Sequence, residues 1–111
     1  SKVLAGEVGE YVAIARKARG APEWFIGALN DRSPRTLALA LDFLEPGKRY
    51  RAEIYRDGEG AGFTGDARFR FVREEKTVTR GDVLPLWLAG GGGAAVRLLP
   101  VAPEAVSAAS P

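Results

Sequence analysis

Two runs of alternating apolar and polar residues, joined by a Pro-Gly turn, constrain the fold of this chain more than any other feature. In the first run, every second residue from Leu37 to Phe43 is a large hydrophobic one, and the second run, from Arg49 to Arg56, places three apolar side chains on one face: Tyr50, Ala52 and Ile54. A period of two residues is typical of a half-buried β-strand. The pattern predicts a β-hairpin whose leucine face lies on a second layer, because an isolated hairpin is marginal in water.

The rest of the chain repeats this kind of pattern in shorter pieces. Further strand-like runs are separated by turns rich in Gly, Pro, Asn and Asp, and they cover residues 3–4, 9–17, 23–30, 68–72, 83–89 and 94–100. About eight short strands without an amphipathic helix predict an all-β fold, an antiparallel two-sheet β-sandwich over residues 1–100. Residues 101–111 are expected to form a flexible Pro/Ala-rich tail. Gly27, inside a predicted strand, suggests a bulge or a close backbone approach.

Composition excludes several function classes. The 111 residues include no Cys and no His, which removes disulfides, thiolate metal sites, thiol nucleophiles and the commonest general base. Sixteen basic and fourteen acidic residues leave a net charge of +2, too small for a general nucleic-acid footprint. No apolar run approaches the ~20 residues of a membrane span, and no signal peptide is seen. We therefore expect no catalysis by this chain alone, no nucleic-acid partner and no membrane partner. Because the chain opens in mid-pattern, we expect a piece of a longer protein.

Two sets of carboxylates are weak candidates for chemistry. Asp57, Glu59 and Asp66 lie in a glycine-rich loop and have the oxygen ligands that Ca²⁺ prefers, but their spacing fails the EF-hand pattern, so a solvated loop is favoured. A glycosidase needs two carboxyl groups about 5 to 10 Å apart in one cleft. The acids available for this lie at turns or on polar strand faces, which favours a non-catalytic interpretation: Glu7, Glu10, Glu23, Asp31 and Asp42.

Aromatic residues raise the question of sugar stacking. Trp24 shares a face with Ile26 and is expected in the core; Tyr11 and Tyr50 are further aromatic residues of the strand-like runs. Tyr55, on the polar face of its strand, and Trp87, between two leucines, are the candidate sugar-stacking residues. The competing interpretations are a surface tyrosine that covers a strand pair and a tryptophan buried against a neighbouring domain.

Two other local patterns have simple structural explanations. A basic stripe has its aromatic residues on the opposite strand face, which favours a charged sheet edge over a nucleic-acid surface: Arg68, Arg70, Arg73, Lys76 and Arg80. The four glycines at 90–93 lack the Lys-Ser/Thr pair and the helix of a phosphate-binding loop, so they predict a turn.

The order of the segments carries a resemblance. The run VLAGEVG at residues 3–9 is followed by IARK at 14–17, Trp24 with Gly27, the leucine strand at 37–44, YRAEIYRDG at 50–58 and the glycines at 90–93. Over about 95 residues these segments, in this order, resemble the C-terminal domain of glycoside hydrolase family 97. The resemblance implies a small β-sandwich that follows an N-terminal β-super-sandwich and a catalytic (β/α)₈ barrel in a bacterial α-glucosidase or α-galactosidase.

The resemblance also sets the functional expectations. No catalytic, cofactor or metal position falls in the matched segments, so Ca²⁺ is expected in the barrel of the parent enzyme and no cofactor in this chain. The main hypothesis is a non-catalytic accessory domain that packs on and stabilises the barrel of the same polypeptide, in a periplasmic or secreted protein. The alternatives are a carbohydrate-binding module that holds an α-glucan or α-galactoside through Tyr55 or Trp87, and a free-standing domain that adds a strand at an open edge. Glucosidase or galactosidase, retaining or inverting chemistry, strand order and oligomeric state are left open.

Overall fold

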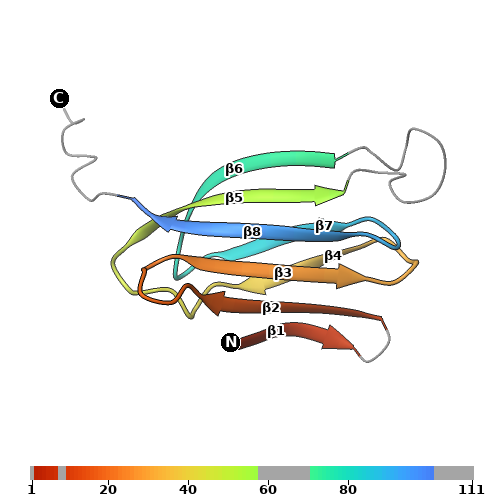
Figure 1. The fold of residues 1–111 in the computed structure, drawn as a ribbon, viewed down its shortest axis with the longest axis horizontal. Helices are drawn as coiled ribbons and strands as arrows, with labels where there is room; N and C mark the ends of the chain where they lie inside the picture. Colours follow the sequence, from red (N-terminus) through yellow and green to blue (C-terminus); the bar gives the residue numbers. More distant parts are fainter. Residues whose placement is uncertain (1, 8–9, 58–70, 102–111) are drawn as a thin grey trace.

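The computed structural model describes residues 2–7, 10–57 and 71–101 of the chain, and within these ranges the backbone forms eight strands. A six-stranded sheet has the order β1-β2-β3-β8-β5-β6, and β4 and β7 form a two-stranded sheet that lies behind it in Figure 1. All neighbouring strands are antiparallel. The predicted all-β two-sheet sandwich is confirmed. The strands are β1 (Lys2–Glu7), β2 (Tyr11–Lys17), β3 (Trp24–Asn30), β4 (Arg35–Ala40), β5 (Arg49–Asp57), β6 (Phe71–Thr79), β7 (Val83–Leu88) and β8 (Gly93–Pro100).

The predicted hairpin between the two alternating runs is wrong. β4 pairs with β7 in the small sheet, whereas β5 lies between β8 and β6 in the large one. The Pro-Gly segment is a real turn, with Gly47 at φ +77°, but it forms part of a corner between the two layers. Leu41 and Leu44 are buried in this corner, which ends β4 at Ala40. Alternation identifies the buried face of β4 and of β5 correctly, and these faces meet across the sandwich instead of lying side by side in one sheet.

The core lies between the two sheets. The small sheet contributes leucines on alternate positions, and the large sheet contributes mostly small or β-branched residues opposite them. Tyr50 is also buried, and its hydroxyl oxygen accepts a hydrogen bond from the Glu45 backbone N–H at 3.4 Å. Each fully buried aliphatic side chain stabilises the fold by roughly 1.5–3 kcal/mol. The core leucines of the small sheet are Leu37, Leu39, Leu84, Leu86 and Leu88.

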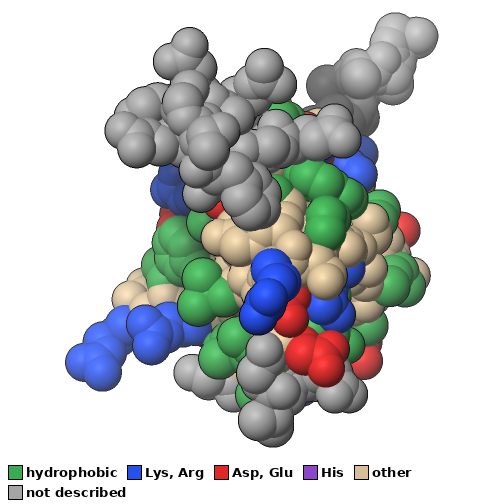
Figure 2. Space-filling view, turned by 90° about the vertical axis from the view of Figure 1, so that its right-hand side faces the viewer, with side chains coloured by type: hydrophobic (Ala, Val, Ile, Leu, Met, Phe, Trp, Pro, Cys, Tyr) green, Lys and Arg blue, Asp and Glu red, His purple; other side chains and the backbone are tan. Residues whose placement is uncertain are grey.

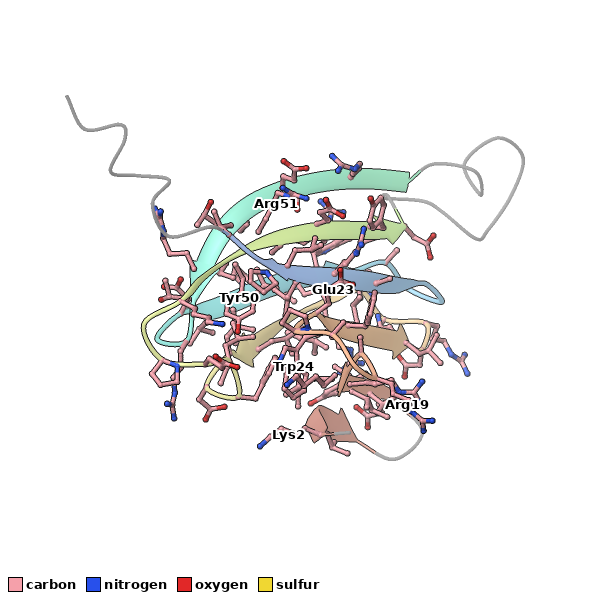
Figure 3. The ribbon with its side chains drawn as sticks, turned by 60° about the vertical axis from the view of Figure 1, so that its left-hand side comes forward. Lys2, Arg19, Glu23, Trp24, Tyr50 and Arg51 are labelled. Carbon is pink, nitrogen blue, oxygen red and sulfur yellow. The ribbon has the colours of Figure 1, made fainter. Side chains whose placement is uncertain are left out.

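Trp24 packs at the margin of this core, as its shared face with Ile26 predicts. Its ring lies 4.6 Å from that of Phe43, centroid to centroid, at a tilt of 52°. Such tilted aromatic pairs add about 0.5–1.5 kcal/mol beyond their buried area. Trp24 and Tyr50 are labelled in Figure 3.

Two turns interlock at the right-hand end of the sandwich in Figure 1, and this end faces the viewer in Figure 2. The Asn30 amide Nδ2 donates to the carbonyl oxygens of Ser33 at 2.8 Å and Ala89 at 3.1 Å, and its backbone N–H donates to Gly92. Gly91 has φ +72°, a conformation that glycine adopts without steric cost. The predicted turn is therefore confirmed at residues 90–92, while Gly93 already begins β8, and the turn holds the start of β8 against the end of β3.

Two further sequence expectations are corrected by the strand positions. The strand predicted at 68–72 is observed as β6, Phe71–Thr79, and residues 68–70 lie outside the described ranges. Gly27 marks no bulge, because β3 pairs in regular register with both neighbours; the register shift among the described strands falls between Val3 and Ala5 of β1. In the turn after β6, the Thr79 backbone N–H donates to the Asp82 carboxylate at 2.7 Å. The predicted tail at 102–111 also lies outside the described residues.

Candidate interaction surface

The outer face of the six-stranded sheet, which points away from the core, carries a cluster of exposed apolar side chains. Ile14 on β2, Phe25 and Leu29 on β3 and Tyr55 on β5 are between 38% and 67% exposed. Their inward-pointing neighbours on the same strands, such as Ala13, Ala15 and Ile26, are buried. β2 and β3 are thus apolar on both faces, a pattern typical of strands that are covered on both sides.

Strand register places small residues at the centre of this cluster. Gly27 lies opposite Ile14 on β2 and opposite Ala95 on β8, and Ala95 in turn lies opposite Tyr55. A hollow of 670 Å³ opens above Gly27 and Ala95, and we call it the Gly27 hollow. Its other lining residues include Val12, Arg16, Phe25, Leu29 and Arg97.

A network of charged side chains borders the hollow along the next row of the sheet. The Glu53 side chain, only 10% exposed, lies 3.2 Å from Arg51, 3.7 Å from Arg97 and 3.9 Å from Arg73. Arg97 also pairs with Glu23 at 3.3 Å. Because Glu53 is surrounded by cations from β5, β6 and β8, its charge is compensated although its exposure is low.

The two candidate sugar-stacking residues lie on different sheets. Tyr55 lines the Gly27 hollow; Arg73 Nε donates to its hydroxyl at 3.2 Å and the guanidinium lies 5.5 Å from the ring centroid. The hydrogen bonds to Tyr55 and Glu75 favour the charged guanidinium and so raise the pKa of Arg73. Trp87, half-buried on β7, has the Arg56 guanidinium 5.2 Å from its ring centroid. The fold therefore does not combine them into one stacking platform.

The carboxylates considered for glycoside hydrolysis are dispersed or bound to arginines. Glu10 and Asp31 do come together, but around Arg35, at 3.7 Å and 3.2 Å. The hydrogen bond from the Ser33 backbone N–H, with help from Arg35, holds the pKa of Asp31 below its usual value. A general acid needs the opposite shift. Glu23 pairs with Arg97, Asp42 is exposed in a turn, and the Glu7 side chain lies outside the described part.

The remaining candidates have structural partners where they are described. Asp57 Oδ2 accepts a hydrogen bond from the Gly93 backbone N–H at 2.9 Å, which joins β5 to the glycine turn. Glu59, Asp66, Arg68 and Arg70 lie outside the described residues. Within the described ranges, no three Asp or Glu side chains are grouped to hold a metal ion, and no helix is long and apolar enough to cross a membrane. β6 is a sheet edge with exposed charges at 73–76, as the basic stripe predicts.

Sequence reasoning missed the apolar outer face, although the signal was present. In 11–17 and 24–30 apolar residues occupy both alternating sets of positions; in the first run Val12 and Ile14 lie on one face, and Ala13 and Ala15 on the other. Such a pattern indicates that neither face is reserved for water. On β2 the larger residues point outward, which is unusual for the free surface of a monomeric protein.

Comparison with known proteins places the chain in a family. A family model described as "Glycosyl-hydrolase 97 C-terminal, oligomerisation" matches residues 1–99. The chain belongs to this family. The resemblance seen in the order of its sequence motifs is thereby confirmed, and the chain corresponds to the C-terminal domain of enzymes in glycoside hydrolase family 97.

Individual relatives agree with this assignment. A retaining alpha-galactosidase of Bacteroides thetaiotaomicron is 33% identical over 98 residues, which are 88% of this chain and 14% of that protein. A glycoside hydrolase family 97 enzyme from Pseudoalteromonas sp., solved with acarbose and, as a variant, with panose, matches with a TM-score of 0.82 and 36% identity over 90% of this chain and 16% of the enzyme. A β-arabinopyranosidase shares the fold, with a TM-score of 0.61 at 21% identity. The family 97 domain thus spans only 14–16% of the length of these family 97 relatives.

Proposed function

We propose that this family 97 domain is a non-catalytic accessory domain that packs on the catalytic (β/α)₈ barrel of the same polypeptide and stabilises it. The observation that supports this is the apolar outer face of the six-stranded sheet, where Ile14, Phe25 and Leu29 are exposed beside the Gly27 hollow. A contiguous exposed apolar patch next to polar residues typically marks an interaction site. Interfaces between domains of one chain bury such patches.

The chemistry of the parent protein follows from this proposal and from its relatives. We place the catalytic carboxylates, and a Ca²⁺ ion, in the barrel, and we propose exo-hydrolysis of α-linked glucosides or galactosides in a periplasmic or secreted bacterial enzyme. The alpha-galactosidase relative supports a galactoside substrate, and the relative solved with panose supports a glucoside. Assays of the whole enzyme with aryl α-glucoside and aryl α-galactoside substrates distinguish the two.

A cleavage experiment on the whole enzyme tests the docking. A specific protease site is inserted directly before Lys2, the enzyme is cut, and the products are separated by gel filtration. We expect the cut domain to stay with the barrel and to elute with it, because the contact does not depend on the covalent link. Elution of the domain as a free species at micromolar concentration would contradict the proposal.

Carbohydrate binding is the alternative function. Tyr55 favours it, since this residue is 38% exposed beside a hollow and has Arg73 as a polar neighbour. NMR titration with maltose, panose and an α-galactoside tests it. Chemical-shift changes that saturate around Tyr55 or Trp87 would support a carbohydrate-binding module. No change at millimolar sugar concentrations would exclude that alternative and support the non-catalytic accessory domain.

A further inference from the structure

Gly27 is a glycine for which the domain itself has no structural use. It lies in the middle of β3, paired in register with Ile14 and Ala95. Among the described glycines, positive φ angles occur at Gly20, Gly47 and Gly91 but not at Gly27, and a Cβ added to Gly27 would meet no atom within 4 Å. A strand glycine destabilises a protein by roughly 0.5–1 kcal/mol relative to alanine. The space above Gly27 is therefore unused by the fold that contains it.

The Gly27 hollow has the size and the lining of a socket for apolar groups. Its volume, 670 Å³, falls in the range of about 300–1,000 Å³ that is typical of ligand pockets. Ile14, Phe25 and Leu29 form apolar walls around the glycine. The hydroxyl groups of a sugar would meet few hydrogen-bond partners on these walls, whereas a projecting apolar side chain would bury its surface against them.

The charged residues at the rim of the hollow indicate the charge expected next to the apolar group of the partner. Arg16 and Arg97 line the hollow next to Phe25, which lies directly opposite both residues across the strand pairs. The carboxylates of Glu23 and Glu53 pair with Arg97. Arg16 is exposed at the rim, where a carboxylate of a partner beside the apolar projection would complement its charge.

Shape and charge disfavour a second copy of the domain as the occupant. If a two-fold axis passed through the hollow, each hollow would face the hollow of the other copy, with no projection to enter it. That arrangement would also bring the arginines of both rims together, which is repulsive. A surface with a projection and an acidic neighbour fits better than a copy of this face.

We propose that the Gly27 hollow is the socket in which this domain receives an apolar side chain projecting from the catalytic part of the same polypeptide, next to a carboxylate that pairs with Arg16. The proposal rests on the proposed function and adds the face, the residues and the chemistry of the contact. It also assigns a reason to Gly27, since a side chain there would occupy the space of the incoming group.

The test uses the cleavable whole enzyme with two pairs of variants. Gly27→Leu places a side chain in the hollow, and Ala38→Leu adds the same side chain at an exposed position on the small sheet. Arg16→Glu reverses the charge at the rim, and Arg19→Glu makes the same reversal at an exposed turn residue, labelled in Figure 3. After cleavage, gel filtration over a dilution series gives the concentration at which half of the domain is released, and circular dichroism of the uncut enzymes checks that each variant is folded.

We expect Gly27→Leu and Arg16→Glu to release the domain at a concentration about tenfold higher or more, and both controls to match the wild type. If Gly27→Leu binds like the wild type, the inference is wrong while the proposed function stands, and release caused by Ala38→Leu would place the contact on the other sheet. A wild-type domain that elutes freely would overturn both proposals. A dimer of domains that Gly27→Leu abolishes would identify a second copy as the occupant and overturn the inference.

Discussion

Replacing Gly27 by Val should make the 111-residue chain more stable, even though the new side chain projects into the hollow proposed for docking. Gly27 has ordinary strand pairing, and no atom lies within 4 Å of the added Cβ. Removing the backbone freedom of a glycine contributes about 0.5–1 kcal/mol, and the β-branched side chain adds a few tenths through strand propensity. The expected gain is about 1 kcal/mol, which raises the unfolding midpoint of a domain of this size by roughly 4–8 °C.

The assay is thermal unfolding followed by circular dichroism, with Gly20→Val as the matched control. A Cβ at Gly20 also meets nothing within 4 Å, but its φ is +72°. A left-handed conformation costs an L-residue roughly 1–2 kcal/mol, so Gly20→Val should lower the midpoint by at least as much as Gly27→Val raises it. A midpoint for Gly27→Val below that of the wild type would refute the reasoning, because it would show that the chain itself needs the space or the backbone freedom at Gly27.

Three further outcomes follow from the same contacts. Leu39→Ala, at a position with 0% exposure, should cost about 2–5 kcal/mol in urea unfolding, whereas Leu29→Ala, at 67% exposure, should cost less than about 0.5; equal losses would contradict the assigned faces. Glu53→Gln should destabilise the chain by about 1–2 kcal/mol, and this loss should be smaller in high salt. The loss is smaller than that expected for breaking a fully buried ion pair, because the three arginines around Glu53 are half-exposed. Unchanged stability would show that the network contributes nothing. The lowered pKa of Asp31 implies a stabilisation that is complete above the unfolded pKa of about 3.9 and is lost as pH falls through the folded pKa. The Asp31→Asn variant should therefore lose less stability than the wild type between pH 5 and pH 2. Parallel stability profiles of the two proteins over this pH range would contradict the expectation.

The sequence predicted the class of fold and the inward face of several strands. Leucines at every second position of β4 and the alternation through Tyr50 and Ile54 in β5 identify surfaces that are buried in the structure. The face that Trp24 shares with Ile26 predicts a place in the core, and Trp24 packs against the core. These are local properties, because the period of two residues is fixed by the backbone of a single strand.

Strand partners could not be read from that periodicity. The turn after β4 suggested pairing with β5, but the chain crosses to the other sheet and β8 inserts between β3 and β5. A Pro-Gly turn permits a hairpin or a corner between layers equally well. The choice depends on the burial of residues far along the chain, such as Leu86 on β7 opposite Leu37 on β4.

The candidate site shows the same division. The local sequence around Tyr55 and around Trp87 makes each a candidate sugar-stacking residue. Only the sheet topology shows that the two residues lie on different layers. The sequence by itself determined which residues alternate, which turns are sharp and that Gly27 lies in a strand. Only the tertiary structure decided that Ile14, Gly27, Ala95 and Tyr55, from four strands, lie in one row, because register and sheet order are set by long-range pairing that no local pattern encodes.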